Sequence, residues 1–224
     1  MGGRGGASHR STAGHFGRDP MLQGFRTFSD SWDAYNWHEQ NNFDFDRWRQ
    51  LLTDAERSGI QMYTGQAYKL MNPVLRENQA AAAYIQRAID GAKAGLAKWE
   101  TSDEFIAFRG ANLHWTANLL GGTEAQLSDA GFLRSRIGKR VTDKGFMSSA
   151  VSKDAAWYAE VDYKIYVRKG VSGMYVEPIT RSGGEYEFLF NSGTQFRIHE
   201  IITDASGRIT SMTLEALPVK KRRR

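Results

Sequence analysis

Two glutamates separated by one residue, Glu185 and Glu187, follow a pair of glycines and precede an apolar run. A strand over 185–190 would place both carboxylates on one face and the aromatic residues of the run on the other, because alternate side chains point to opposite sides. Those aromatic residues are Tyr186, Phe188 and Phe190. Two adjacent carboxylates repel when both are ionised, so one pKa usually rises, as in acid/base and glycosyl-transfer sites. A solvated edge strand is the ordinary alternative for such a pair taken alone.

Two further segments carry polar side chains on apolar strands. Arg109 closes the run 105–109 and is followed by Gly110, so its permanently charged guanidinium stands at a strand end where a phosphate could approach closely. Ser148 and Ser149 lie on a run entered through glycine. Their hydroxyls point to opposite faces, so one of them can hold a neighbouring carboxylate. Either segment alone is typical of an ordinary sheet surface.

A third polar group is expected on a helix. Tyr63, Tyr68 and Asn72 occur in the stretch 63–76. Tyr68 and Asn72 are four residues apart, so they share one helical face.

The order of these motifs along the chain resembles that of the arginine-specific mono-ADP-ribosyltransferases. The nearest likeness is to the exotoxin branch that includes the catalytic domains of actin-modifying binary toxins, whose hallmark is an arginine, a Ser-Thr-Ser strand and a Glu-x-Glu pair. The resemblance covers roughly residues 21–217. It implies an α+β fold in which an N-terminal helical layer packs on two mainly antiparallel β-sheets, with an NAD cleft between them.

The resemblance also implies a role for each matching residue, with NAD as co-substrate and no metal. Glu187, positioned by Ser148, would hold the nicotinamide ribose and stabilise the positive charge that develops as nicotinamide leaves. Glu185 would orient the incoming guanidinium and take its proton, and Arg109 would bind the NAD phosphates. The implied catalytic residues are Glu187, Glu185, Arg109 and Ser148. The implied contacts to NAD come from Arg109, Gly110, Tyr63, Tyr68, Asn72, Ser148, Ser149 and Glu187.

The chain departs from the family pattern at two positions. Ala150 stands where the third hydroxyl of Ser-Thr-Ser would be. Ser182 replaces an aromatic residue that toxins of this branch often carry in the turn that presents the acidic pair, here 179–184, so the target is not inherited from the actin-modifying members. The family also tends to offer an aromatic for nicotinamide and a basic residue for phosphate, and ordinary core or surface roles stay open for the candidates. These are Trp157, Tyr158 and Lys164.

The leading hypothesis is an NAD-dependent mono-ADP-ribosyltransferase that modifies an arginine of a protein target and releases nicotinamide. Glu185 favours arginine as acceptor, since relatives with glutamine at this place tend to modify other side chains. One alternative is an NAD glycohydrolase, in which water replaces the acceptor. Another is a catalytically idle binding module that is associated with nucleic acid or with a virion. The expected partners are NAD and the protein target, with weak nucleic-acid contact through the tails and a monomeric catalytic domain.

Composition excludes several other classes of protein. The 224 residues contain no cysteine, which excludes disulfides and iron–sulfur clusters, and the five histidines lack metal-ligand spacing. No apolar run reaches the roughly 18 residues of a membrane span, and no signal peptide is recognisable, so we expect synthesis in a cytoplasm, with delivery or secretion by a separate system. Of the net charge of +5, residues 220–224 carry +5 and residues 1–20 carry +2, so the body between them carries −2. A basic binding face on the body is not supported.

We expect one ADP-ribosyltransferase domain over residues 21–217, between a disordered Gly/Arg-rich leader over 1–20 and a basic tail over 218–224. Thr53-Asp-Ala-Glu56 fits a capping box, which predicts a helix that begins near Asp54. Further helices are expected over 66–75 and 79–99, and 111–137 and 151–163 are expected to be helical or irregular. Strands are expected over 105–109, 145–149, 164–167, 173–176, 185–190, 195–202 and 208–217.

Overall fold

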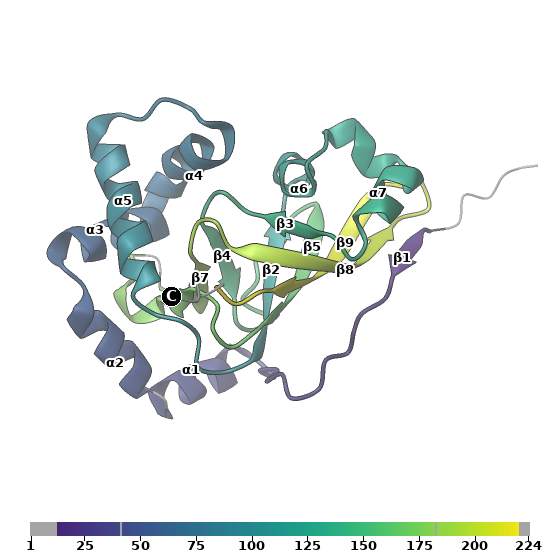
Figure 1. Cartoon of the computed structure of the whole chain (residues 1–224). Coiled ribbons are helices and arrows are strands. Elements are labelled where there is room, and N and C mark those ends of the chain that lie inside the picture. Colours follow the sequence, from purple (N-terminus) through teal and green to yellow (C-terminus); the bar gives the residue numbers. More distant parts are fainter. Residues whose placement is uncertain (1–12, 41, 182, 220–224) are drawn as a thin grey trace, which may run out of the picture.

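The computed structural model describes residues 13–40, 42–181 and 183–219, and the N-terminal part of this range forms a helical layer (Figure 1). Its helices are α1 (Ser31–Gln40), α2 (Asn42–Leu51), α3 (Asp54–Met62), α4 (Tyr68–Glu77) and α5 (Ala83–Ala97). A π-helical turn, Tyr63–Ala67, joins α3 to α4 and is kinked at Gly65. The expected capping box is confirmed, because Thr53 Oγ1 accepts the Glu56 N–H at 3.3 Å and Glu56 Oε2 accepts the Thr53 N–H at 2.7 Å.

The strands of the described residues form a single sheet of nine strands in the order β1-β8-β9-β5-β2-β4-β7-β6, with β3 paired to β8. They are β1 (His15–Gly17), β2 (Phe105–Ala111), β3 (Arg140–Thr142), β4 (Met147–Ala150), β5 (Val161–Val167), β6 (Gly173–Tyr175), β7 (Glu187–Phe190), β8 (Gln195–Thr203) and β9 (Ile209–Ala216). Strands β5 and β9 run parallel, and the other pairs of strands are antiparallel. Each strand predicted from the sequence is present with shifted ends, and β1 and β3 are additional.

The two sheets predicted from the sequence are two parts of this one sheet. The two parts are joined where β2 meets β4, and the pairing of these two strands consists of the residue pair Phe108↔Ala150. Next to it, the guanidinium Nη1 of Arg109 donates a hydrogen bond to the Ser148 carbonyl across the two strands. We call this junction the β2–β4 seam, and the acidic motif of β7 lies one strand away from it.

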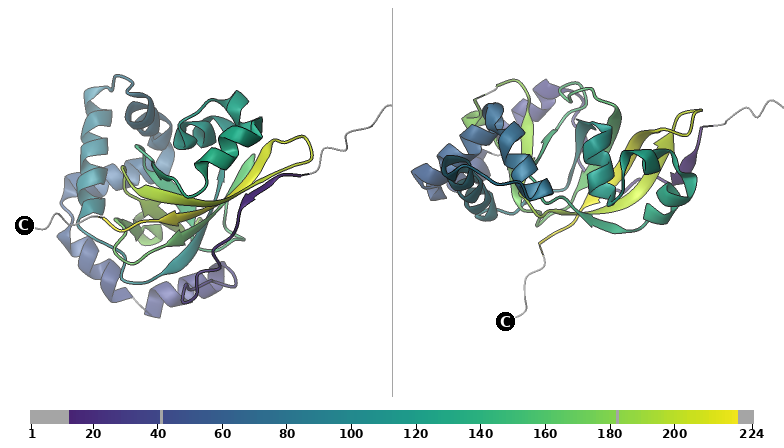
Figure 2. Two further views of the ribbon diagram at one scale, coloured as in Figure 1. Left: turned by 45° about the vertical axis from the view of Figure 1, so that its right-hand side comes forward. Right: turned by 90° about the horizontal axis from the view of Figure 1, so that it is seen from above.

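Two hydrophobic clusters hold the layers together, and Figure 2 shows helices on both sides of the sheet. The first cluster joins the helical layer to β6 and β7 and includes Trp48, Ile60, Met71, Phe146, Met174 and Leu189. The second joins the sheet to α6 (Leu113–Leu120) and α7 (Ala130–Arg136) and includes Phe105, Leu120, Leu133, Phe188, Phe190 and Phe196. Strand β7 contributes to both, because Leu189 and its neighbours Phe188 and Phe190 point to opposite faces. The α+β class and the N-terminal helical layer are as predicted.

The prediction of a disordered leader over residues 1–20 is wrong for residues 13–20. Strand β1 pairs with the edge of β8, and Phe16 is buried there. The Asp19 carboxylate accepts hydrogen bonds from Lys164 Nζ at 2.6 Å and from the Tyr166 hydroxyl at 2.7 Å. An open sheet edge and a cationic partner thus order a segment of polar composition. Residues 1–12 and 220–224 lie outside the described residues, and within those described no helix has the length and apolar character of a membrane span.

Candidate active site

Glu187 is the first residue of β7 and exposes only 2% of its surface. It lies opposite Ala150 in the register of β4 and β7, so Ser148 is diagonal to it on the same face and Ser149 points to the other face. Burial raises the pKa of Glu187 to about 7; the Ser148 hydroxyl and Arg109 act to lower it, and Glu185 and Glu177 act to raise it. Its Oε2 has no hydrogen-bond partner among the described residues, so this oxygen can still accept a ligand hydroxyl.

Glu185 lies in the turn before β7, because the strand begins only at Glu187. The prediction that Glu185 lies on the strand is therefore wrong. Tyr186 between the two glutamates has a φ of +47°, which breaks the alternation of a strand. Glu185 is half-buried, and burial, followed by the charge of Glu177, raises its pKa. The two carboxylates are close enough to interact, since the charge of Glu185 raises the pKa of Glu187. One of them is carried by a turn and the other by a strand. Tyr186 packs partly buried against the second cluster, where Phe188 is fully buried as predicted.

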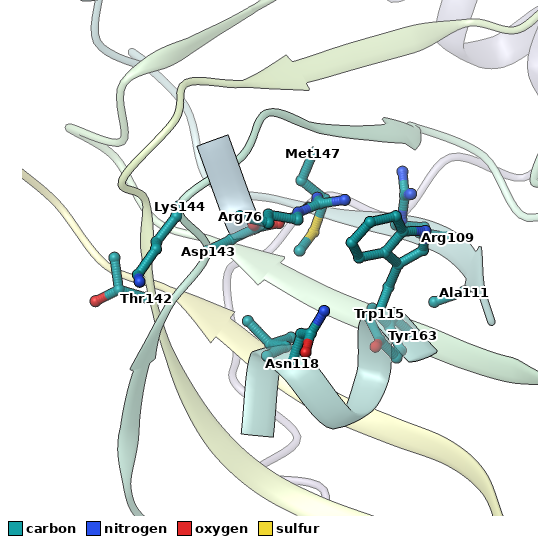
Figure 3. Close-up of a pocket in the computed structure, with 11 residues that line it drawn as sticks. Arg76, Arg109, Ala111, Trp115, Asn118, Thr142, Asp143, Lys144, Met147 and Tyr163 are labelled. Carbon is teal, nitrogen blue, oxygen red and sulfur yellow. Dashed lines mark hydrogen bonds and ion pairs between the residues drawn. The ribbon is translucent and has the colours of Figure 1, made fainter. Parts of the chain in front are cut away.

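Arg109 lines a pocket of about 240 Å³ beside the β2–β4 seam. Figure 3 shows the side chains around this pocket, which come from α4, β2, α6, the segment between β3 and β4, and neighbouring strands. The charged or hydrogen-bonding residues among them include Arg76, Arg109, Trp115, Asn118, Asp143 and Lys144. Three cationic side chains against one carboxylate favour an anionic ligand such as a phosphate.

Tyr63 and Asn72, predicted to line an NAD site, are buried and hold the segment that enters β4. Asn72 Oδ1 accepts the Phe146 N–H at 2.9 Å, and its Nδ2 donates to the Tyr63 hydroxyl at 3.2 Å. The Tyr63 hydroxyl donates to the Phe146 carbonyl at 3.2 Å, and burial raises the pKa of Tyr63 to about 12. Tyr68, whose ring centroid lies 6.2 Å from that of Tyr63, exposes 41% of its surface and is the accessible member of the three.

Arg76 is a pocket residue that the predicted site does not include. Its Nε and Nη2 donate to the two carboxylate oxygens of Asp143 at 2.8 and 2.7 Å, and Nη2 also donates to the Phe146 carbonyl at 2.9 Å. Burial acts to lower the pKa of Arg76, but the hydrogen bonds and charge of Asp143 raise it overall. The sequence holds a signal for Arg76, which follows Asn72 by four residues on the same helical face. It holds none for Asp143, which meets Arg76 only through the fold.

Gly110, which the resemblance places at the NAD phosphates, packs against the backbone of residues 157–159. A Cβ built at Gly110 would lie 2.1 Å from the Trp157 carbonyl oxygen and 2.8 Å from the Ala159 nitrogen. The glycine thus allows the loop between β4 and β5 to pack against β2. The aromatic side chains of that loop, Trp157 and Tyr158, are 71% and 91% exposed.

Ser149 and Lys164 are not directed at Glu187. The Ser149 hydroxyl donates to the Phe188 carbonyl at 3.1 Å on the other face of the sheet. Lys164 forms an ion pair with Asp19 at 2.6 Å, so its charge is already engaged by the N-terminal segment. Ser182 lies outside the described residues.

Comparison with known proteins agrees with this architecture. Two curated relatives are similar in sequence. The NAD(+)–arginine ADP-ribosyltransferase EFV of Enterococcus faecalis is 23% identical over 158 residues, which are 69% of this chain and 31% of that protein. The mono-ADP-ribosyltransferase C3 of Hathewaya limosa is 22% identical over 194 residues, 81% of this chain and 75% of that protein. The chain thus spans about a third of the Enterococcus protein.

The fold has solved counterparts. The crystal structure of C3stau2 from S. aureus with NAD superposes with a TM-score of 0.69 and 18% identity, covering 87% of this chain and 99% of that one. The family described as ADP-ribosyltransferase exoenzyme matches residues 34–221, which include each of the predicted site residues. The resemblance predicted from the four motifs is confirmed. The chain belongs to the ADP-ribosyltransferase exoenzyme family.

Proposed function

We propose that this chain cleaves the bond between nicotinamide and ribose in NAD and transfers ADP-ribose to an arginine side chain of a protein. The observation that carries the proposal is the buried Glu187, with Ser148 on the same face of the sheet. Arg109 lowers the pKa of Glu187 and also lines the cationic pocket. The names of both relatives and the family match support ADP-ribose transfer, and the name of the Enterococcus relative supports arginine as the acceptor.

Arg109, Arg76 and Lys144 would bind the dinucleotide phosphates. The Arg109 guanidinium uses Nη1 for the Ser148 carbonyl, which fixes its position and leaves other donors for a phosphate oxygen. Arg76 is fixed by Asp143, and its guanidinium carbon lies 4.9 Å from the Trp115 ring centroid, so it contributes charge with little loss of side-chain entropy on binding.

Glu187 would act at the ribose. Its free Oε2 would accept a hydrogen bond from a ribose hydroxyl, and its ionised form would stabilise the positive charge on the sugar as the carbon–nitrogen bond to nicotinamide breaks. The raised pKa of about 7 means that the group is partly protonated at neutral pH, so cleavage should become faster as pH rises through this value.

Glu185 would act at the acceptor. An arginine is protonated at physiological pH, so one guanidinium nitrogen must lose a proton when it bonds to the ribose carbon. Glu185 is half-buried and has a raised pKa, and both properties suit a base that receives this proton. Water can take the place of the acceptor at the ribose carbon, so NAD hydrolysis is the competing reaction and the second candidate function.

Incubation with labelled NAD tests the proposal. Wild type, Glu187→Ala and Glu185→Gln would be compared for nicotinamide release and for transfer to agmatine and to proteins of a lysate. We expect Glu187→Ala to lose both reactions, and Glu185→Gln to keep hydrolysis and lose transfer to arginine. Equal labelling by wild type and Glu187→Ala would refute the catalytic assignment, and nicotinamide release with no transfer to any acceptor would favour the glycohydrolase.

We further infer that the catalytic unit is a monomer of residues 13–219, that the protein is delivered to its target by a separate system, and that the terminal segments contact nucleic acid weakly. The +5 charge of residues 220–224 supports the last point. Salt-sensitive binding that survives deletion of residues 1–12 and 220–224 would contradict it, and sedimentation of the purified chain would test the monomer.

A further inference from the structure

Glu177 is a third carboxylate next to the acidic pair, and no motif pointed to it. It begins the short 3₁₀ helix Glu177–Ile179 that follows β6 and leads into the turn before β7. Its Oε1 accepts a hydrogen bond from the backbone N–H of Gly184, the residue before Glu185. Its Oε2 is buried and has no hydrogen-bond partner among the described residues. A buried carboxylate oxygen without a hydrogen-bond partner costs stability, so its presence calls for a functional reason.

The backbone around Glu177 is tied to both ends of the turn. The N–H of Val176 donates to the Glu187 carbonyl at 2.8 Å, so the residue before Glu177 is held in register with the start of β7. Gly184 and Tyr186 have φ values of +88° and +47°, and Glu185 lies between them. A non-glycine residue at positive φ is disfavoured, so the conformation that presents Glu185 needs support from outside the turn. The Gly184 N–H bond to Glu177 supplies it.

Charges from several elements meet at this place. Besides burial, four groups change the pKa of Glu187. Ser148 from β4 and Arg109 from β2 lower it, and Glu185 from the turn and Glu177 from the 3₁₀ helix raise it. The buried Tyr63 also lies within reach of the Glu187 and Arg109 charges. Glu177 raises the pKa of both Glu185 and Glu187, although burial is the larger cause for each. The charge of Glu177 therefore reaches both the carboxylate proposed for the ribose and the carboxylate proposed for the acceptor.

We propose that Glu177 is a positioning residue for the acceptor: its hydrogen bond to Gly184 holds the turn so that Glu185 faces the incoming side chain, and its charge favours a cationic guanidinium over a neutral acceptor. The proposal rests on the proposed transferase function. It assigns acceptor selection to a group outside the Glu-x-Glu motif.

Two variants separate the hydrogen bond from the charge. Glu177→Ala removes both, whereas Glu177→Gln keeps an amide oxygen that can accept from Gly184 and removes the charge. Asp90→Asn, which removes an exposed carboxylate on the outer face of α5, serves as the matched control. Each would be assayed for NAD hydrolysis and for transfer to agmatine from about pH 5 to about pH 9, with urea unfolding in parallel.

We expect Glu177→Ala to lower the ratio of transfer to hydrolysis about tenfold, the equivalent of one charge-assisted hydrogen bond. Glu177→Gln should recover part of this ratio and shift the pH midpoint of hydrolysis downward, since one negative charge beside Glu187 is gone. Asp90→Asn should change neither. A ratio that stays constant in Glu177→Ala, or a fall in both reactions in proportion to lost stability, would overturn the proposal.

Failure of the transferase function is distinguishable from failure of this proposal. If wild type does not cleave NAD, the proposed function fails, and the positioning role is then tested by amide hydrogen exchange at Gly184 and Glu185. Faster exchange in Glu177→Ala, restored in Glu177→Gln, supports the role in holding the turn. Unchanged exchange at both amides would refute it.

Discussion

The raised pKa of Glu187 predicts that the contribution of this residue to stability is lost as pH rises, and that Glu187→Gln removes this part of the pH dependence. Glutamine keeps the shape of the side chain and cannot ionise. Below pH 4.5, the ordinary value for glutamate, the carboxyl is protonated in both the folded and the unfolded chain, so wild type and variant should respond to pH alike.

The magnitude follows from the difference between the two states. As pH rises above 4.5, the unfolded chain ionises first, while the folded chain keeps the proton until about pH 7. The stability that the protonated folded state holds at low pH is therefore lost between these values. The shift from 4.5 to about 7 corresponds to about 3 kcal/mol at pH 8. Glu187→Gln should gain this amount relative to wild type while losing NAD cleavage.

The assay is urea unfolding of both proteins, monitored by tryptophan fluorescence at about pH 5, 6, 7 and 8. The informative quantity is the pH dependence of the difference in unfolding free energy, because a constant offset from the amide cancels. Glu56→Gln is a control of opposite sign: burial acts to raise the pKa of Glu56, but hydrogen bonds from Lys98 and Thr53 lower it overall. Its loss should therefore destabilise the protein more at neutral than at acid pH. A difference between wild type and Glu187→Gln that does not change with pH would refute the reasoning.

Three further outcomes follow from the geometry. Ala150→Ser would place a hydroxyl directly opposite Glu187, where it can donate to the free Oε2. The pH midpoint of NAD cleavage in a pH–rate profile should therefore fall by about one unit, and an unmoved midpoint would contradict this placement. Arg76→Met should destabilise the protein by about 3–5 kcal/mol in urea unfolding, since Asp143 would be left buried without its partner, whereas Arg109→Lys should mainly raise KM for NAD. Gly110→Ala should cost about 1–3 kcal/mol, because its Cβ would lie 2.1 Å from the Trp157 carbonyl oxygen, whereas Gly183→Ala, whose nearest contact is at 3.7 Å, should unfold like wild type.

Local patterns in the sequence determined much of the fold. The capping box placed the start of α3 because both of its hydrogen bonds lie within four residues. The alternation of Phe188, Leu189 and Phe190 predicted which side chains of β7 enter the core, since a strand has a period of two. The four ordered motifs indicated the family, because each combines a residue type with a spacing that a local element can present on one face.

The tertiary structure decided what each polar side chain touches. Lys164 pairs with Asp19, Arg76 with Asp143, and the Gly110 surface is covered by the loop 157–159, and all three contacts join segments far apart in the chain. The sequence placed Glu185 on a strand beside Glu187, but Tyr186 at positive φ puts it in a turn whose conformation depends on Glu177. The residue types and their order determined the kind of chemistry. Burial, which sets the pKa of Glu187 near 7, arises only when the helical layer and β4 close over the start of β7, because desolvation is a property of the packed chain and not of a motif.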